Sequence, residues 1–391
     1  MAALYVPISL SVLEWLIHKA EVSGNTSAYD LLKKWRYGKK QATFHQIEEL
    51  SKKMQIPLGY FFLQKPPIET CPLTEFRTVD SVDNGGEPSA NLVDTFDMMI
   101  DVQDWMRDYV KDMGQEKKAY VASCNEKMSV TAISETIRRD LHLVEDWMCQ
   151  QKSAKESFNF LRHRCQNEGI LIMMNGVVGS NTHRPLNLQE FRAFTLVDDY
   201  VPLIFINAQD SHSGRLFSLL HEIAHIWIGI NSIYNDNLAN IENTVSPKEQ
   251  LCNAVASELL VPVHIFQKAW NENQESLLER INHLSRTFTC SSVVIARKAL
   301  DAKYIPEDEY HKITALAIKN YKAMQDKKKS GGNYYNTMAS RLDANFVYAI
   351  TESAKAGRTQ YSDIYRLTNT NRTTFKEIYQ RLLAGEGGVK E

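Results

Sequence analysis

The stretch Leu216-Phe-Ser-Leu-Leu-His-Glu-Ile-Ala-His-Ile-Trp-Ile-Gly229 decides the fold that we expect for this chain. It is long and apolar enough for a buried helix, and Asp210 and Ser211 ahead of it signal the helix start. Side chains four positions apart share one face of a helix, so the rings of His221 and His225 point the same way. The sequence therefore predicts a buried helix that carries two imidazoles on one side.

Two histidines at this spacing, with Glu222 between them, are typical of a catalytic zinc site. A catalytic zinc needs three protein ligands and a water, so a third ligand must come from elsewhere. No His-x-x-Gly-x-x-His continuation follows His225, which favours a carboxylate over a third histidine. We expect one zinc ion per chain, with Glu222 as the general base and His221 and His225 as ligands, and hence amide hydrolysis.

The third ligand is expected from a helix over Pro247–Leu260, which contains two glutamates. At about 100° per residue, Glu249 falls at the edge of the apolar face of this helix, whereas Glu258 points well away from it. Asn253 follows Glu249 by one turn, where its amide could hydrogen-bond a histidine ligand. We therefore expect Glu249 as the ligand, with Glu242, in a stretch that reads as loop, as the weaker alternative.

Three segments before the motif read as strands: 169–174, 191–196 and 200–207. Most of the remaining chain shows helical periodicity. The expected class is α+β, mainly helical, with a small mixed sheet packed on a zincin-like His-Glu-x-x-His helix. The segment 200–207 is either an edge strand on which an extended substrate pairs or an ordinary internal strand.

A chain of 391 residues is too long for one ordinary core, so several domains are expected. Residues 1–70 indicate a small helical domain, and 71–150 a helical connecting region. Residues 151–305 form the expected peptidase domain around the motif. Residues 306–391 form a helical C-terminal region after a short linker. Residues 327–332 are a linker-like break that contains a short basic run.

Composition narrows the possible partners and the compartment. With 45 basic and 47 acidic side chains, the net charge of −2 gives no global attraction to nucleic acid or to an acidic membrane. The six cysteines form no Cys-x-x-Cys pair, which favours reduced thiols in the cytoplasm. No stretch has the apolar length of a membrane span. We expect a cytoplasmic protein with no membrane partner.

Beyond these patterns, a series of short motifs resembles the ImmA/IrrE family of metallo-endopeptidases over most of residues 10–305. In chain order the motifs are Trp35-Arg-Tyr-Gly, Leu58-Gly-Tyr-Phe-Phe-Leu-Gln-Lys-Pro-Pro, Glu75-Phe-Arg, Glu190-Phe-Arg-Ala-Phe-Thr-Leu, Pro202-Leu-Ile-Phe-Ile-Asn, Leu220-His-Glu-Ile-Ala-His and Glu249-x-x-Cys-Asn-Ala-x-Ala-x-Glu-Leu-Leu-Val-Pro. The resemblance implies zinc ligands at His221, His225 and Glu249, with Glu222 as general base.

Members of that family commonly cleave a helix-turn-helix repressor, and some are encoded beside the repressor or antitoxin on which they act. The resemblance thus implies a zinc-dependent endopeptidase that cleaves a specific regulatory protein, a helix-turn-helix repressor or antitoxin of a mobile element, stress or defence system. The alternative is a DNA-binding transcriptional regulator or toxin-antitoxin partner, in which the peptidase fold serves sensing or protein interaction.

Many longer relatives also carry an N-terminal helix-turn-helix, and the segment 35–62 is similar to the last part of one. Between Ala20 and Trp35, however, there is too little chain for the usual pair of helices. We therefore expect a degenerate helix-turn-helix segment, for which DNA binding is the weaker expectation. The basic side chains that could contact phosphates, or simply form a solvated face, are Lys33, Lys34, Arg36, Lys39 and Lys40.

Overall fold

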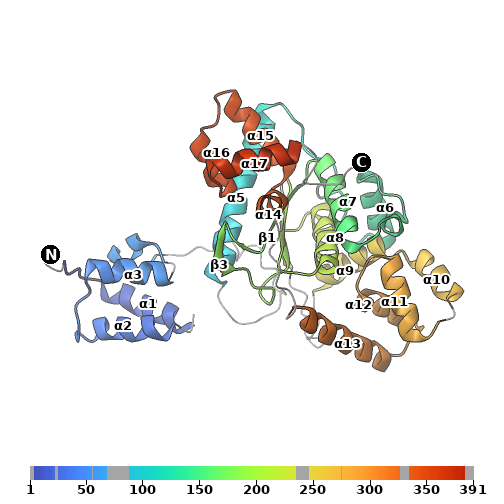
Figure 1. The fold of residues 1–391 in the computed structure, drawn as a ribbon, viewed down its shortest axis with the longest axis horizontal. Coiled ribbons are helices and arrows are strands. Elements are labelled where there is room, and N and C mark those ends of the chain that lie inside the picture. Colours follow the sequence, from blue (N-terminus) through green and yellow to red (C-terminus); the bar gives the residue numbers. More distant parts are fainter. Residues whose placement is uncertain are drawn as a thin grey trace. The chain divides into compact units, whose positions relative to one another are not determined.

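The computed structural model shows a mainly helical chain with a small mixed sheet, which confirms the expected α+β class (Figure 1). It describes residues 4–22, 25–54, 56–67, 88–234, 246–273, 275–325 and 334–383. The chain divides into two compact units, Met1–Thr74 and Glu75–Glu391. Among the residues described, no helix combines the length and the apolar character needed to cross a bilayer.

The first unit is a small bundle around an apolar core that includes Leu16, Leu32 and Ile47. Its elements are α1 (Leu10–Val22), α2 (Thr26–Arg36), α3 (Phe44–Met54) and the 3-10 helix η1 (Leu58–Phe62). The hydroxyl of Thr43 accepts a hydrogen bond from the N–H of Gln46 at 3.3 Å and so caps the start of α3.

The basic residues of this unit are not all available to a partner. Arg36 forms an ion pair with Glu14 at 2.8 Å, and the ammonium of Lys33 lies over the ring of Tyr29. Of the five basic residues expected to form this face, Lys34, Lys39 and Lys40 are exposed. Part of the expected basic face therefore has partners within this unit.

In the second unit, four strands form a sheet in the order β1-β5-β4-β6, with β1 parallel to β5 and the other pairs antiparallel. The strands are β1 (Leu171–Asn175), β4 (Ala193–Leu196), β5 (Leu203–Asn207) and β6 (Ser232–Tyr234). The three strands expected from the sequence are confirmed. Because β5 lies between β1 and β4, the edge-strand interpretation of residues 200–207 is wrong.

Three short strands were not expected from the sequence. One is β6, and the others are β2 (Val177–Val178) and β3 (Asn181–Pro185), which pair as a separate two-stranded sheet. Two of these strands, β2 and β6, are very short, and β3 is mostly polar. None of the three therefore has enough alternating hydrophobicity to indicate a strand. Of these three, β6 pairs with β4 and also contacts the motif helix.

Helices cover both faces of the four-stranded sheet. The motif helix α8 (His212–Ile228) packs on β4 and β5, while α5 (Ala90–Asp112) packs on the other face, where Phe96 lies 5.2 Å from Phe194 between ring centroids. Side chains alternate between the faces of a strand. Thr195, next to Phe194, is therefore directed to the α8 side.

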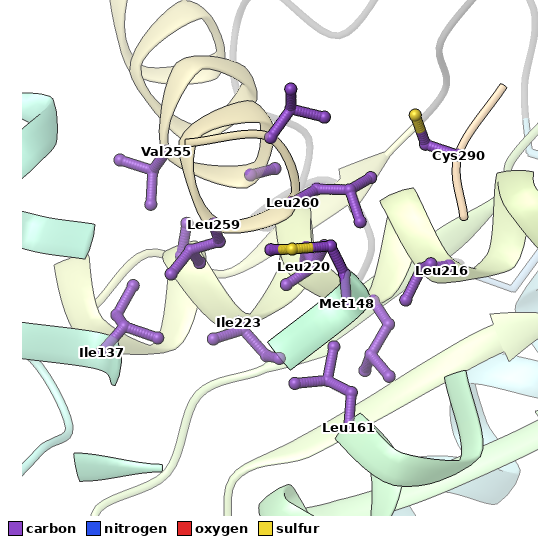
Figure 2. Close-up of a cluster of buried hydrophobic side chains, with 14 of the residues drawn as sticks. Ile137, Met148, Leu161, Leu216, Leu220, Ile223, Val255, Leu259, Leu260 and Cys290 are labelled. Atoms are coloured by element: carbon purple, nitrogen blue, oxygen red, sulfur yellow. The ribbon is translucent and has the colours of Figure 1, made fainter. Parts of the chain in front are cut away.

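The helix α8 is buried from Ser218 to its last residue because helices surround it as well as the sheet. Figure 2 shows the apolar cluster in which it packs against α9 (Pro247–Leu260), α6 (Val130–Asp140), α7 (Ala154–Asn167) and the 3-10 helix η2 (Trp147–Gln150). Its labelled members include Leu216, Leu220 and Ile223 of α8 and Val255, Leu259 and Leu260 of α9. This cluster fixes α9 against the motif helix.

The remaining helices follow α9 along the chain. They are α10 (Val263–Glu272), α11 (Leu277–Thr287), α12 (Ser292–Asp301), α13 (Glu307–Gln325), α14 (Tyr334–Arg341), α15 (Ala344–Lys355), α16 (Tyr361–Thr368) and α17 (Arg372–Leu383). The last four gather beside α5 and β1 (Figure 1). The expected linker run 327–332 lies outside the described residues.

Side chains rather than another strand satisfy the outer edge of β1. The Asp343 carboxylate accepts hydrogen bonds from the N–H of Ile172 at 2.9 Å and from Nε2 of Gln166 at 2.8 Å. The guanidinium of Arg162 donates to the carbonyls of Ile172, at 2.9 Å, and Leu342, at 2.7 Å. Burial lowers the pKa of Arg162, and the charge of Asp343 acts against this shift. This buried network attaches α14–α17 to the sheet.

We expect Asp343→Ala to lower the free energy of unfolding by about 3–5 kcal/mol, because it leaves the buried N–H of Ile172 and amide of Gln166 without their acceptor and removes the charge that favours ionised Arg162. It also removes the N-cap of α15. The matched control is Asn371→Ala, which removes an exposed cap that accepts from the N–H of Thr374, and should cost about 1 kcal/mol. Denaturant unfolding measures both. Equal losses would show that the network contributes nothing beyond capping.

A second prediction concerns the end of α8. Gly229 caps the helix with φ of 80°, and a Cβ there would lie 2.6 Å from the Cβ of Ala122. We expect Gly229→Ala to cost about 2–4 kcal/mol, because a left-handed backbone and a steric overlap add. Gly114 has φ of 72° and open space around it, so Gly114→Ala should cost only about 1 kcal/mol. Thermal unfolding tests the difference, and similar melting temperatures would contradict it.

Candidate metal centre

The motif helix brings its two histidines together one turn apart. Ser211 caps the start of α8 by accepting from the N–H of Gly214, as the sequence predicted, so the register of the helix is fixed from its first turn. The Nε2 atoms of His221 and His225 lie 3.0 Å apart, and both side chains are fully buried. Both ring nitrogens therefore face one common point.

The first turn of α9 brings a carboxylate to the same point. Ser246 caps this helix through the N–H of Glu249, and Pro247 occupies its first turn. Oε2 of Glu249 lies 3.0 Å from Nε2 of His221, and Oε1 lies 3.4 Å from Nε2 of His225. The structure thus joins the three expected ligands, which come from two helices that the apolar cluster of Figure 2 holds together.

The other two glutamates considered for this role are placed differently. Glu258 is bound to Lys298 of α12 at 3.0 Å and accepts from the N–H of Val263. The sequence put Glu258 away from the buried face of α9, but the side chain is itself buried, because α12 covers that side. Periodicity identified one buried face where the helix has two. Glu242 lies outside the described residues.

The donor set fits a zinc ion. One donor atom from each of His221, His225 and Glu249 lies within 4.8 Å of the others, and no other such group of three occurs in the part of the chain that the structure describes. Donors about 2.0–2.1 Å from a tetrahedral zinc lie about 3.3 Å from one another, close to the separations of 3.0–3.4 Å found here. Two imidazoles and one carboxylate are also common zinc ligands.

Asn253 orients one of the histidines. Nδ1 of His221 lies 2.9 Å from Oδ1 of Asn253, which can only accept, so Nδ1 carries a proton and Nε2, 3.0 Å from Glu249, is the nitrogen left for a metal ion. An outer partner of this kind fixes both the tautomer and the rotation of a ligand ring. Asn253 therefore lies where the sequence placed it, one turn beyond Glu249.

The electrostatics of the site link metal binding to protons. Burial tends to raise the pKa of Glu249, but hydrogen bonds from His221 and His225 outweigh it and hold the pKa below its usual range. Burial tends to lower the pKa of His225, but Cys252 and Glu249 outweigh it and raise the pKa well above its usual value. A metal ion entering this site therefore displaces a proton.

Glu222 lies between the two histidines in sequence and is fully buried. Its Oε2 accepts hydrogen bonds from Thr195 Oγ1 at 2.5 Å and Ser232 Oγ at 2.7 Å. Burial raises the pKa of Glu222, while the two histidines and the two hydroxyls act in the opposite direction. The carboxyl group is thus held close to the metal ligands in surroundings that make it more basic than a solvent-exposed glutamate.

Sequence reasoning assigned no role to Thr195 or Ser232. A signal existed for Thr195, because alternation along the predicted strand 191–196 puts it on the opposite face from Phe194 and Leu196. No comparable signal existed for Ser232, whose short strand lies in a polar stretch. Its role depends on pairing with β4, which local sequence does not encode.

Comparison with known families places the centre inside a matched region. Residues 165–300 match the family model of the IrrE N-terminal-like domain, Peptidase_M78, and residues 342–381 match a domain of unknown function, DUF8813. No curated protein and no solved structure gave a match. The first match contains the four-stranded sheet, α8 and α9, and therefore all three candidate ligands. It supports the resemblance to the ImmA/IrrE family and a metallopeptidase-type function, which implies a metal ion, typically zinc.

Proposed function

We propose that this protein is a zinc-dependent endopeptidase in which His221, His225 and Glu249 hold one zinc ion and Glu222 is the general base. The observation that carries the proposal is the convergence of these ligands beside the buried carboxyl group of Glu222. The match of residues 165–300 to a peptidase family supports the same reaction class.

The chain's own residues account for the proton transfers of such a reaction. When bound, zinc polarises a peptide carbonyl and makes water more acidic. Glu222 takes a proton from the attacking water, whose oxygen bonds to the carbonyl carbon. The C–N bond then breaks, and Glu222 returns the proton to the leaving nitrogen. Asn253 keeps His221 in its metal-binding orientation throughout.

We further propose a single regulatory protein as the substrate, a helix-turn-helix repressor or an antitoxin, on the basis of the family resemblance. The burial of the site supports narrow specificity. His221, His225 and Glu222 are fully buried, and Glu249 is 8% exposed. A peptide reaches such a site only when specific contacts present it, which suits a protease with one matched substrate better than a digestive enzyme.

Zinc affinity tests the ligand set. We expect the wild-type protein to bind about one zinc per chain. Glu249→Gln should weaken binding by more than about 100-fold, because it replaces a carboxylate ligand. Asn253→Ala should weaken it by about 10–100-fold, because it removes the side chain that orients His221. Glu272→Gln, an exposed glutamate on α10, is the control and should bind as the wild type does. Competition with a chromophoric chelator measures all four proteins, and equal affinities would contradict the assignment.

Glu222→Gln separates catalysis from the alternative roles. This variant should keep its zinc but lose cleavage by about 100-fold or more, because glutamine cannot accept a proton. The measurement is labelling of new protein N-termini in a lysate of the source cells, incubated with the wild type or the variant. New N-termini seen only with the wild type identify the substrate. A regulator or toxin-antitoxin partner would instead keep its function in Glu222→Gln.

A further inference from the structure

Two hydroxyl groups on neighbouring strands hold the proposed base. Thr195 of β4 and Ser232 of β6 lie directly opposite each other in the antiparallel register. Both side chains are fully buried, and both donate to the same atom, Oε2 of Glu222, at 2.5 and 2.7 Å. We call this pair of residues the hydroxyl clamp.

The clamp makes the two oxygens of Glu222 unequal. Oε2 accepts two hydrogen bonds, whereas Oε1 is buried and has no hydrogen-bond partner among the described residues. A buried polar atom without a partner costs about 1–3 kcal/mol, and Oε1 is the one carboxylate oxygen among the described side-chain atoms in this state. The lone pairs of Oε1 are the ones left to receive a proton.

We propose that Thr195 and Ser232 are positioning residues that anchor Glu222 through Oε2 and so make Oε1 the oxygen that accepts the proton from the attacking water. This inference rests on the proposed endopeptidase function and deepens it. Neutral hydroxyls suit the task because they fix the carboxylate and leave its negative charge in place. A lysine or arginine at the same distance would neutralise that charge.

The clamp also makes the base depend on the sheet. Because the side chains of a strand alternate between faces, a one-residue slip of β6 against β4 would turn Ser232 away from α8. Thr195 and Ser232 act together only in the observed register. The sheet thereby sets the rotation of Glu222, while α9 sets the position of the metal ligand Glu249.

The same hydrogen bonds in a purely structural role would only compensate the burial of Glu222. Kinetics on a synthetic peptide that spans the cleavage site found by N-terminal labelling separates the two roles. We expect Thr195→Val and Ser232→Ala each to lower kcat by about 100-fold, because the base loses its alignment, with KM and zinc content close to wild type. Thr195→Ser, which keeps the hydroxyl, should recover most of kcat.

Matched controls remove a buried hydroxyl whose hydrogen bond lies outside the site. Thr351→Val deletes a donor to the carbonyl of Val347, and Ser157→Ala deletes a bond to Thr289. Both should lower the melting temperature and leave kcat unchanged. The proposal is overturned if the clamp variants lose melting temperature as the controls do while their kcat stays within about twofold of wild type.

A spectroscopic readout tests the clamp without any cleavage. In zinc-loaded protein labelled with ¹³C-carboxyl glutamate, the infrared difference between wild type and Glu222→Gln isolates the Glu222 band. We expect this band to move in Thr195→Val and Ser232→Ala and to return in Thr195→Ser. An unmoved band overturns the anchoring of Oε2. If the band moves in the clamp variants but the wild-type protein cleaves nothing, the anchoring is supported and only the endopeptidase function is contradicted.

Discussion

The apolar contact between α8 and α9 is the constraint on which the metal centre depends. Leu220 and Ile223 of α8 pack with Leu259 and Leu260 of α9 in the apolar cluster of Figure 2. No polar residue at the centre could create this arrangement, since Glu249 and the histidines become favourable neighbours only after the helices have met. The hydrophobic effect thus provides the energy, and the caps of both helices provide the register.

Elements with a strong local pattern could be predicted from the sequence. The limits of α9 and the start of α8 follow from caps and helical period, and three strands follow from apolar runs. The ligand positions followed because spacing on a helix fixes direction. What could not be predicted depends on pairing across the chain: Ser232 on β6, the second buried side of α9 at Glu258, and the bond between Asp343 and Ile172.

Four of the buried carboxylates that the structure describes in the second unit are compensated in four ways. Glu258 has the ammonium of Lys298, and Asp343 has backbone N–H groups and the amide of Gln166. Glu249 faces two imidazoles, which a metal ion replaces as the counter-charge. Only Glu222, among these four, has one oxygen with two donors and one with none. An incomplete set of partners at a fully buried anion costs stability, and a chemical role explains why it is retained.

The network at Asp343 joins the two segments of the chain that match different family models. The two family matches, 165–300 and 342–381, suggest modules that could be separated. Yet Ile172, inside the first match, donates its N–H to the carboxylate of Asp343, inside the second. Its carbonyl accepts from Arg162, which also donates to the carbonyl of Leu342. A chain cut between the matches would leave the edge of β1 open as a template for other strands, and self-association is the usual fate of such an edge. The second matched segment thus covers, through Asp343, a strand edge of the first that would otherwise favour self-association.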